Sequence, residues 1–350
     1  DRHLGSLFYY LKAQAQNESF YKETLTKASF ASARAASFRA LCKRLLLDSG
    51  LYELVFAPRL SREMLAWVEK FRPDAIFAQG YNLTFTWLPL MLARYFNLPI
   101  IYYPTDDWPS DLYKKSFVHS IVQKASHQLV STAQICIAFN SLMQQEYLQR
   151  YAREFVVLMH GDNWDRFLNI PPKRLAQQDE YWIVSTGVFN KSRLPLLFDL
   201  NEACRLLNTW GIHAKATVFS VNPIRVPGAE ELEYLAIEPA PSHTELVAFL
   251  RGADVLFLPE RFDESVRDVR LCISSKAHLF MFAEKPIVVY SDPLTGIVRY
   301  AREDGWGAVV DKRDPAALAE TFGCLLNDVD EQRCLVNRAR QIAAQNHSLS

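Results

Sequence analysis

Two segments of the sequence place basic side chains where an apolar run gives way to a helix-like stretch. The first, residues 185–193, contains Gly187, Phe189, Lys191 and Arg193. A glycine there lets the backbone approach an anion, and the N-terminus of a helix offers free N–H groups and a positive dipole potential. The segment predicts a binding site for a diphosphate, although a solvated turn with incidental charges accounts for the same residues equally well.

The second segment follows the apolar run 255–258. Glu260 comes just beyond this run, where the ligand sites of open α/β sheets lie, and Ser274, Ser275 and Lys276 begin another helix-like stretch. Two hydroxyls, free N–H groups and an ammonium together form a cradle for an anion. The alternative is an ordinary helix N-terminus with a lysine that faces solvent, which is the commoner occurrence.

Carboxylates and aromatic side chains gather at the end of an apolar run in the first half of the chain. Asp106, Asp107 and Trp108 follow Tyr103 in a stretch that ends at Pro109. Because neighbouring side chains of an extended chain point to opposite sides, only one carboxylate can face a ligand as a base. Trp108 is suited to stack on a sugar ring. The alternative for the whole stretch is a capped turn before a proline.

The histidines and cysteines do not have the spacing of a metal site. His160 and His278 are isolated, and a lone histidine is more often structural than a ligand or a base. No P-loop, GxGxxG, GxSxG or HExxH motif occurs. The cysteines form no CxxC pair, which predicts reduced, structural thiols and no metal. They are Cys42, Cys136, Cys204, Cys272, Cys324 and Cys334.

The elements that must position these residues follow from an alternation of short apolar runs with longer amphipathic stretches. Nearly all-apolar runs predict strands buried on both faces, as in parallel sheets covered by helices. The predicted strands are residues 54–57, 75–78, 100–103, 135–138, 156–159, 182–185, 216–219, 234–237, 255–258, 287–290 and 308–310. The predicted helices include residues 12–50, 61–71, 83–95, 194–210 and 242–250, and one that begins at Asp314 and Pro315.

Composition excludes several classes of function. The chain has 350 residues and a formal net charge of zero, which argues against a nucleic-acid partner. No apolar run reaches the roughly 18 to 20 residues that span a bilayer. We expect a cytoplasmic protein, with peripheral attachment to the inner face of the membrane left open. The polar stretch 166–180, with Pro171 and Pro172, predicts a boundary between two domains.

In their order and spacing, these segments resemble the GT-B glycosyltransferases. The resemblance is to the large retaining family of bacterial polysaccharide and lipid glycosyltransferases (glycosyltransferase group 1 type). It is strongest in the second half. There, Gly187 to Arg193 is similar to a family segment that runs from a glycine to an arginine or lysine and follows the first strand of the second lobe. Further similarity lies in residues 253–259, 275–288, 305–310 and 314–319, and in residues 72–76 and 137–155 of the first half.

The resemblance implies an α/β protein of two Rossmann-like lobes that face a cleft. Residues 1–166 would bind the acceptor and residues 167–350 the nucleotide sugar. A hexosyltransferase-like, retaining enzyme of polysaccharide biosynthesis would move a sugar from a nucleotide-diphosphate sugar to a saccharide, lipid-linked or protein acceptor, with no cofactor required. Lysine and arginine side chains and a helix N-terminus would stabilise the diphosphate.

The resemblance also implies roles for individual residues. Catalytic roles fall to Asp106, Asp107, Lys191 and Lys276. The donor-binding set is Gly187, Phe189, Lys191, Arg193, Glu260, Ser274, Ser275, Lys276 and His278, and the acceptor-binding set is Tyr81, Asn82, Asp106, Asp107 and Trp108.

One departure from the family keeps other functions open. The family's Glu-x7-Glu pair falls on Leu271 and Leu279, while Glu260 and Asp268 have that spacing further upstream. A catalytically silent GT-B-shaped binding or scaffold protein is therefore one alternative. A nucleotide-sugar epimerase, which needs no separate acceptor, is the other.

Overall fold

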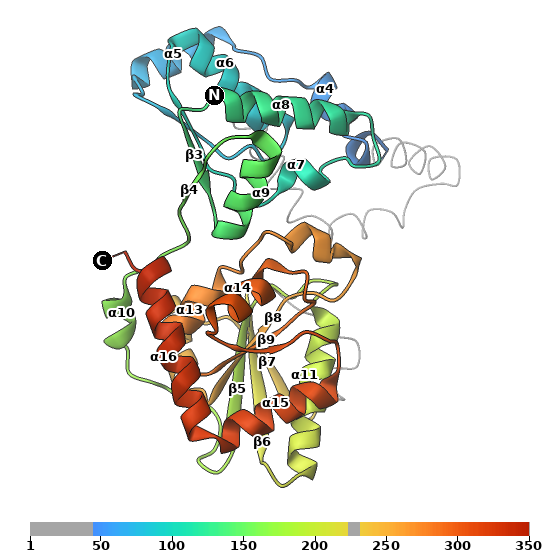
Figure 1. The fold of residues 1–350 in the computed structure, drawn as a ribbon, viewed down its shortest axis with the longest axis vertical. Coiled ribbons are helices and arrows are strands. Elements are labelled where there is room, and N and C mark those ends of the chain that lie inside the picture. The colour runs from blue at the N-terminus through green and yellow to red at the C-terminus, as the bar shows by residue number, and fades with distance from the viewer. Residues whose placement is uncertain (1–44, 223–231, 350) are drawn as a thin grey trace, which may run out of the picture.

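The short apolar runs become two parallel β-sheets in the computed structural model, which describes residues 45–222 and 232–349 (Figure 1). The first sheet has the order β1-β2-β3-β4, and every adjacent pair in it is parallel. Its strands are β1 (Ile76–Ala78), β2 (Ile100–Tyr102), β3 (Ile135–Ala138) and β4 (Val156–Val157). Its flanking helices are α4 (Leu51–Val55), α5 (Arg62–Phe71), α6 (Leu83–Phe96), α7 (Trp108–Asp111), α8 (Val118–Thr132) and α9 (Ser141–Tyr151).

The second sheet has the order β10-β9-β8-β5-β6-β7 and is also parallel. Its strands are β5 (Tyr181–Gly187), β6 (Ala214–Ser220), β7 (Leu235–Pro239), β8 (Val255–Pro259), β9 (Ile287–Tyr290) and β10 (Ala308–Val310). Strands β8 and β9 are buried at every residue, as all-apolar strands inside a covered sheet must be. The α/β architecture of two parallel sheets predicted from the sequence is confirmed.

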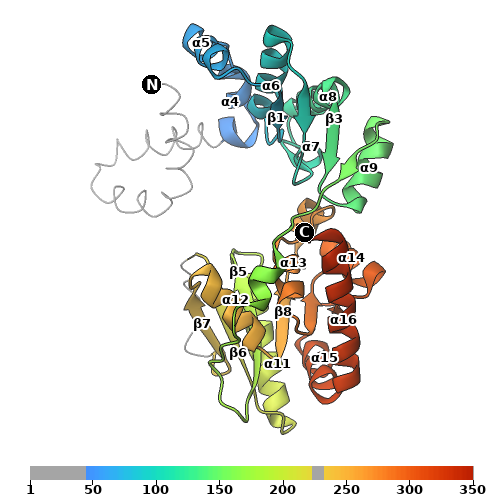
Figure 2. The same cartoon turned by 90° about the vertical axis from the view of Figure 1, so that its left-hand side faces the viewer.

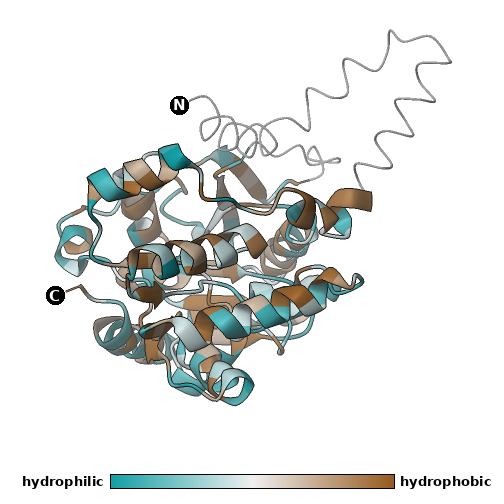
Figure 3. Cartoon of the chain, turned by 90° about the horizontal axis from the view of Figure 1, so that it is seen from above, coloured by the Kyte–Doolittle hydropathy of each residue, from teal (hydrophilic) through white to brown (hydrophobic). Residues whose placement is uncertain are grey.

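Helices cover both faces of this second sheet. One face packs against α12 (His243–Gly252), α13 (Lys276–Phe282), α14 (Gly296–Asp304) and α16 (Val329–Asn346). The other face packs against α11 (Leu194–Thr209) and α15 (Pro315–Asn327). A short 3-10 helix, η3 (Glu264–Val269), lies between β8 and α13. Seen from above in Figure 3, the surface helices carry both hydrophilic and hydrophobic residues, as expected of helices that bury one side.

The two lobes are stacked end to end (Figure 2), and the chain crosses between them after β4 (Figure 1). Helix α10 (Trp164–Leu168) already belongs to the second lobe, because the rings of Trp164 and Phe167 lie 5.3 and 5.0 Å from that of Phe282. The predicted boundary between residues 166 and 167 thus falls inside α10. We call residues 158–163, between β4 and α10, the crossing segment, and a backbone bridge between Asp162 and Ser348 joins it to the residues after α16.

The prediction of a strand at residues 54–57 is wrong, since Leu51–Val55 is helix α4. The reason lies in Glu53, which is buried and accepts the backbone N–H of Leu83 at 2.6 Å. Its carboxylate thereby satisfies a free N–H group in the first turn of α6, and a helical turn presents it with Leu51 and Leu54 to the same interior.

The other predicted strands are confirmed, with ends that differ by a few residues. Of the predicted helix 12–50, residues 45–48 are helical and residues 12–44 lie outside the described residues. Within the described part of the chain, no helix is both long enough and apolar enough to cross a membrane.

Candidate functional site

The second sheet reverses its winding between β5 and β8. From β5 the chain adds β6 and β7 on one side, and from β8 it adds β9 and β10 on the other. In open α/β sheets, ligands bind in the crevice outside the carboxyl ends of the strands at such a switch point. Strand β5 ends at Gly187, and Glu260 follows the last residue of β8. These ends define the place where a ligand is expected.

Lys276, the first residue of α13, brings an ammonium group to this crevice. Its Nζ is buried and has no hydrogen-bond partner among the described residues. The side chain lies over the end of β5, because a Cβ placed on Gly187 would be 3.2 Å from Nζ. Burial lowers the pKa of Lys276 to about 8, with Arg193 lowering it further and Glu260 opposing the shift. A buried cation without a partner is unfavourable, so the arrangement is suited to receive an anion.

Two arginines add to the positive charge around Lys276. Arg193 donates from Nη2 to the carboxylate of Glu260 and from Nη1 to the carbonyl oxygen of Val188 at 3.1 Å. The Nε atoms of Arg193 and Arg261 are buried without a hydrogen-bond partner in the described part of the chain, and Nε of Arg261 lies 3.9 Å from Oε1 of Glu260. Glu260 is only 4% exposed. Three cations therefore surround one buried carboxylate, and the excess of positive charge favours a ligand with more than one negative charge.

Asp268 is a second carboxylate near this cluster, but it lies outside the crevice. Its Oδ2 is 3.7 Å from Nη1 of Arg261, and its side chain is 55% exposed. An exposed ion pair is weakened by solvent, so Asp268 neutralises little of the buried charge. We call Gly187, Arg193, Glu260, Arg261 and Lys276 the switch-point cluster.

A side chain at position 187 is expected to destabilise the fold. Its φ of +139° belongs to a region that L side chains rarely adopt, and a Cβ would press on the Lys276 side chain. We expect Gly187→Ala to lower the free energy of unfolding by about 1–3 kcal/mol in urea titrations and to displace Lys276.

Gly211→Ala is the matched control for this substitution. Gly211 also has a positive φ, +83°, but no described atom lies within 4 Å of its Cβ position. Both variants should lose stability, and only Gly187→Ala should change anion binding. An unchanged anion affinity in Gly187→Ala would contradict the close approach of Gly187 and Lys276.

The remaining residues of the predicted donor-binding set lie in several different environments. Lys191 is exposed, unlike the buried Nζ of Lys276. Phe189 is buried in the core, and its N–H donates to Oδ1 of Asn222 at 3.1 Å. Ser275 precedes α13 without a side-chain capping bond, and the carbonyl of Ser274 accepts the N–H of Ala277.

His278 faces the crossing segment rather than the cluster. Its ring centroid lies 6.3 Å from that of His160 and 5.8 Å from that of His347. Burial lowers the pKa of His278 to about 4, and the neighbouring imidazoles act in the same direction. The ring is therefore neutral near pH 7 and packs where the two lobes join.

The two adjacent aspartates of the first lobe point in different directions, as expected for neighbouring residues. Asp107 is buried and receives both Nη atoms of Arg150, at 2.6 and 2.9 Å, together with the hydroxyls of Tyr147 and Ser110. Asp106 instead faces the second lobe, where it accepts the thiol of Cys272 at 2.9 Å. Of the two carboxylates, Asp106 is therefore the one presented between the lobes.

The predicted acceptor-binding aromatics form a surface cluster on the first lobe. The rings of Tyr81 and Trp108 meet edge to face at 5.6 Å, and Trp108 is 38% exposed. Asn82 caps α6 by accepting the N–H of Phe85. Tyr81 and Trp108 thus present an apolar ring surface, while the side-chain oxygen of Asn82 is occupied.

Sequence reasoning did not include Arg261 or Cys272 in the site. Arg261 directly follows Glu260 at the carboxyl end of β8, and this position was the available signal. Leu271, which stands where the family has a carboxylate, is buried in the core, and its carbonyl accepts the amide of Asn140 at 2.7 Å. Leu279 is partly buried against the same core.

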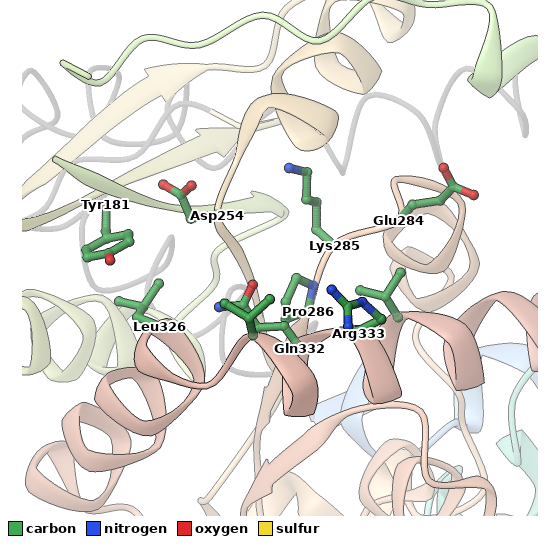
Figure 4. Close-up of a pocket in the computed structure, with 10 residues that line it drawn as sticks. Tyr181, Asp254, Glu284, Lys285, Pro286, Leu326, Gln332 and Arg333 are labelled. Carbon is green, nitrogen blue, oxygen red and sulfur yellow. The ribbon is translucent and has the colours of Figure 1, made fainter. Parts of the chain in front are cut away.

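A separate pocket of about 290 Å³ lies at the opposite, amino ends of β5, β8 and β9 (Figure 4). Figure 4 shows Asp254 and Lys285 on one side of it and Arg333 of α16 on the other. The carboxylate of Asp254 is occupied by the N–H of Trp182 and by Arg174 at 2.8 Å. Because ligands of open α/β sheets bind at the carboxyl ends, we place the functional site at the switch point instead.

Comparison with solved structures supports the architecture. The chain is similar to sucrose-phosphate synthase from Thermosynechococcus elongatus, with a TM-score of 0.59, 15% identity, and coverage of 83% of this chain and 76% of that one. It is also similar to Alr3699/HepE from Anabaena in complex with UDP and glucose, with a TM-score of 0.59, 12% identity and coverage of 83% and 80%.

A third similar structure is described as a UDP-N-acetylglucosamine 2-epimerase from Listeria monocytogenes, with a TM-score of 0.53, 14% identity and coverage of 80% and 74%. No protein-family model matches the chain, and no curated protein sequence matches it. At these identities the comparisons establish the fold, and the predicted two-lobe GT-B architecture is confirmed.

Proposed function

We propose that this GT-B chain is a glycosyltransferase that takes its sugar from a nucleotide-diphosphate sugar bound at the switch-point cluster. The observation that carries the proposal is the buried ammonium of Lys276, which has no partner among the described residues and lies over Gly187. A diphosphate would supply the missing negative charge and accept hydrogen bonds from Lys276, Arg193 and Arg261. Alr3699/HepE, of similar fold, is a complex with UDP-glucose in one of its structures.

In this proposal the cluster stabilises the leaving group. Negative charge develops on the diphosphate as the bond to the sugar breaks, and cations already fixed by folding stabilise that charge without reorganisation. Glu260 holds Arg193 in place through their ion pair. No cofactor is required for this role, because the protein's own side chains supply the positive charge.

The acceptor would approach from the first lobe. Asp106 is the carboxylate that faces between the lobes, and Tyr81 and Trp108 offer rings on which a sugar can stack. A saccharide, lipid-linked or protein acceptor fits this surface. Retention of configuration, a place in polysaccharide biosynthesis, and a cytoplasmic location with contact to the inner face of the membrane remain parts of the proposal.

Two alternative functions, a nucleotide-sugar epimerase and a catalytically silent scaffold, can be distinguished from glycosyl transfer by experiment. The similar fold of the Listeria epimerase favours a nucleotide-sugar epimerase as the second candidate. A silent scaffold is disfavoured, because a protein without a ligand gains nothing from a buried, unpartnered lysine. Release of free nucleotide from UDP-glucose would support transfer or hydrolysis, whereas conversion of the sugar without nucleotide release would support epimerisation.

The first test is a thermal-shift screen with UDP, GDP, ADP and their common sugars. A ligand at about 100 times its Kd adds roughly 2.7 kcal/mol to the free energy of unfolding, which a melting curve detects. We expect one nucleotide to raise the Tm clearly. No shift with any of them would contradict the proposal and favour the scaffold.

The affinity for UDP should depend on pH through Lys276. The amine binds a diphosphate when protonated, and burial lowers its pKa in the free protein to about 8. Binding should therefore weaken as the pH rises through about 8, with a proton taken up on binding above that value. Isothermal titration calorimetry at pH 7 and pH 9 checks this, and an affinity independent of pH would contradict a charged Lys276 at the ligand.

A further inference from the structure

A thiol from the second lobe meets a carboxylate from the first. Cys272, in the turn before α13, donates its Sγ–H to Oδ1 of Asp106 at 2.9 Å, although the two residues are 166 positions apart. The thiol is largely buried, and burial together with the Asp106 charge raises its pKa well above the ordinary value. At neutral pH the group is therefore a neutral S–H donor rather than a thiolate.

The backbone around Cys272 is fixed to the first lobe by two further contacts. The carbonyl of Leu271 accepts the amide N–H of Asn140 at 2.7 Å, and Nη1 of Arg270 lies 3.1 Å from Oε2 of Glu146. Asn140 is fully buried and also caps α9. Three consecutive residues of the second lobe, 270–272, thus each contact the first lobe. We call these residues the interlobe strap.

The strap is also next to the switch-point cluster. Cys272 lies four residues before Lys276, and the Glu260 charge acts on both side chains. On the other side, Asp106 is close enough to His160 of the crossing segment to influence its imidazole. Asp106 therefore lies near the crossing segment and contacts Cys272, four residues before the lysine of the cluster that would hold the diphosphate.

We propose that Cys272 is a positioning residue that orients the Asp106 carboxylate toward the reacting sugar when the interlobe strap joins the two lobes. The proposal rests on the proposed function, because it gives Asp106 a task only if a sugar nucleotide occupies the cluster. A carboxylate on a loop can rotate, and a directed donor fixes one oxygen and leaves the other free for an acceptor hydroxyl. Because Cys272 comes from the opposite lobe, the orientation exists only with the lobes together.

The test compares Cys272→Ala and Cys272→Ser with the unchanged full chain, using UDP-glucose as the probe. Loss of the donor should lower kcat for UDP release about tenfold, the order expected for one hydrogen bond to a charged group, while the Kd for UDP changes less than about twofold. Serine keeps a donor and should restore most of the lost kcat. Cys136→Ala is the matched control, because Cys136 is also buried and its thiol donates to the carbonyl of Val130 at 3.7 Å, within the first lobe.

An infrared measurement tests the contact without relying on turnover. The S–H stretching band of Cys272, isolated by subtracting the spectrum of Cys272→Ala, should shift to higher frequency when Asp106→Ala removes the acceptor. If UDP-glucose is turned over and Cys272→Ala leaves kcat unchanged, the positioning role is overturned although the proposed function stands. If neither UDP-glucose nor any other nucleotide or nucleotide sugar of the thermal-shift screen is bound or turned over, the proposed function fails instead. An S–H band that does not respond to Asp106→Ala overturns the contact itself.

Discussion

Lys276→Met is expected to remove the nucleotide-induced rise in Tm while leaving the unliganded protein as stable as before or more stable. The ammonium is buried without a partner among the described residues, so methionine of similar shape relieves its desolvation. The same change removes a cation from the proposed diphosphate site. We expect the Kd for UDP to rise about 100-fold, in the range for charged hydrogen bonds in a buried site.

Lys215→Met is the matched control, because Lys215 lies in the same lobe at the amino end of β6 and is half exposed beside Glu180. It should leave UDP binding unchanged. If Lys276→Met kept its affinity for every nucleotide that the unchanged protein binds, Lys276 would have no part in the site.

The pH dependence of stability gives a second signature of Lys276. Its pKa is about 8 in the folded protein, below the ordinary value of 10.5, so the unfolded chain binds more protons between these two pH values. Stability without ligand should therefore rise with pH through this window, by about 3 kcal/mol relative to Lys276→Met. Chemical denaturation at pH 7.5 and pH 10 checks the sign. Parallel curves for the two proteins would mean that the amine is not buried in solution.

Arg150→Met is expected to give the largest loss of stability, about 3–5 kcal/mol in the free energy of unfolding. Asp107 is buried and receives both Nη atoms of Arg150, so the substitution leaves a carboxylate in the interior without its cation. Tyr147 and Ser110 would still donate to it, but neither carries a compensating charge. Urea titrations followed by fluorescence measure the loss.

Arg302→Met provides the comparison for this change. Arg302 pairs with Asp311 at 2.6 Å, but its side chain is 48% exposed, so losing the pair should cost less than about 1 kcal/mol. Equal losses in the two variants would show that burial of the Asp107 carboxylate contributes little. The catalytic and acceptor-binding roles of Asp107 remain predictions. In this structure its carboxylate supports the fold of the first lobe.

The sheets could be predicted because strands that are buried on both faces consist almost entirely of apolar residues. Strands such as β8 and β9 are runs of apolar residues, because both faces of their sheet are covered by helices. Residues 54–57 form a similar run, yet Leu54 and Val55 belong to helix α4, and residues 56 and 57 to the turn and loop after it. The deciding contact, between Glu53 and the start of α6, joins residues 30 positions apart, and no local pattern reports it.

The sequence predicted those residues of the candidate site whose positions are determined by the carboxyl ends of the strands. Gly187, Arg193, Glu260 and Lys276 come together because the carboxyl ends of β5 and β8 are neighbours in the sheet. Their role in donor binding stays a prediction. The partner of each aspartate was not predictable, because Arg150 is 43 positions from Asp107 and Cys272 is 166 positions from Asp106. Such pairings depend on how the lobes pack.

The arrangement of the switch-point cluster also bears on how such a chain can diversify. All five of its residues lie from position 187 to position 276, within one lobe and near the carboxyl ends of β5 and β8, whereas the aromatic surface of Tyr81 and Trp108 belongs wholly to the other lobe. Recombination within the crossing segment would therefore replace the aromatic surface of the first lobe and leave the switch-point cluster of the second lobe intact. A hybrid protein would have to preserve only the few pairings across the junction, among them Asn140 with the carbonyl of residue 271 and Glu146 with Arg270. The proposed anion site and the proposed acceptor surface would then be inherited separately.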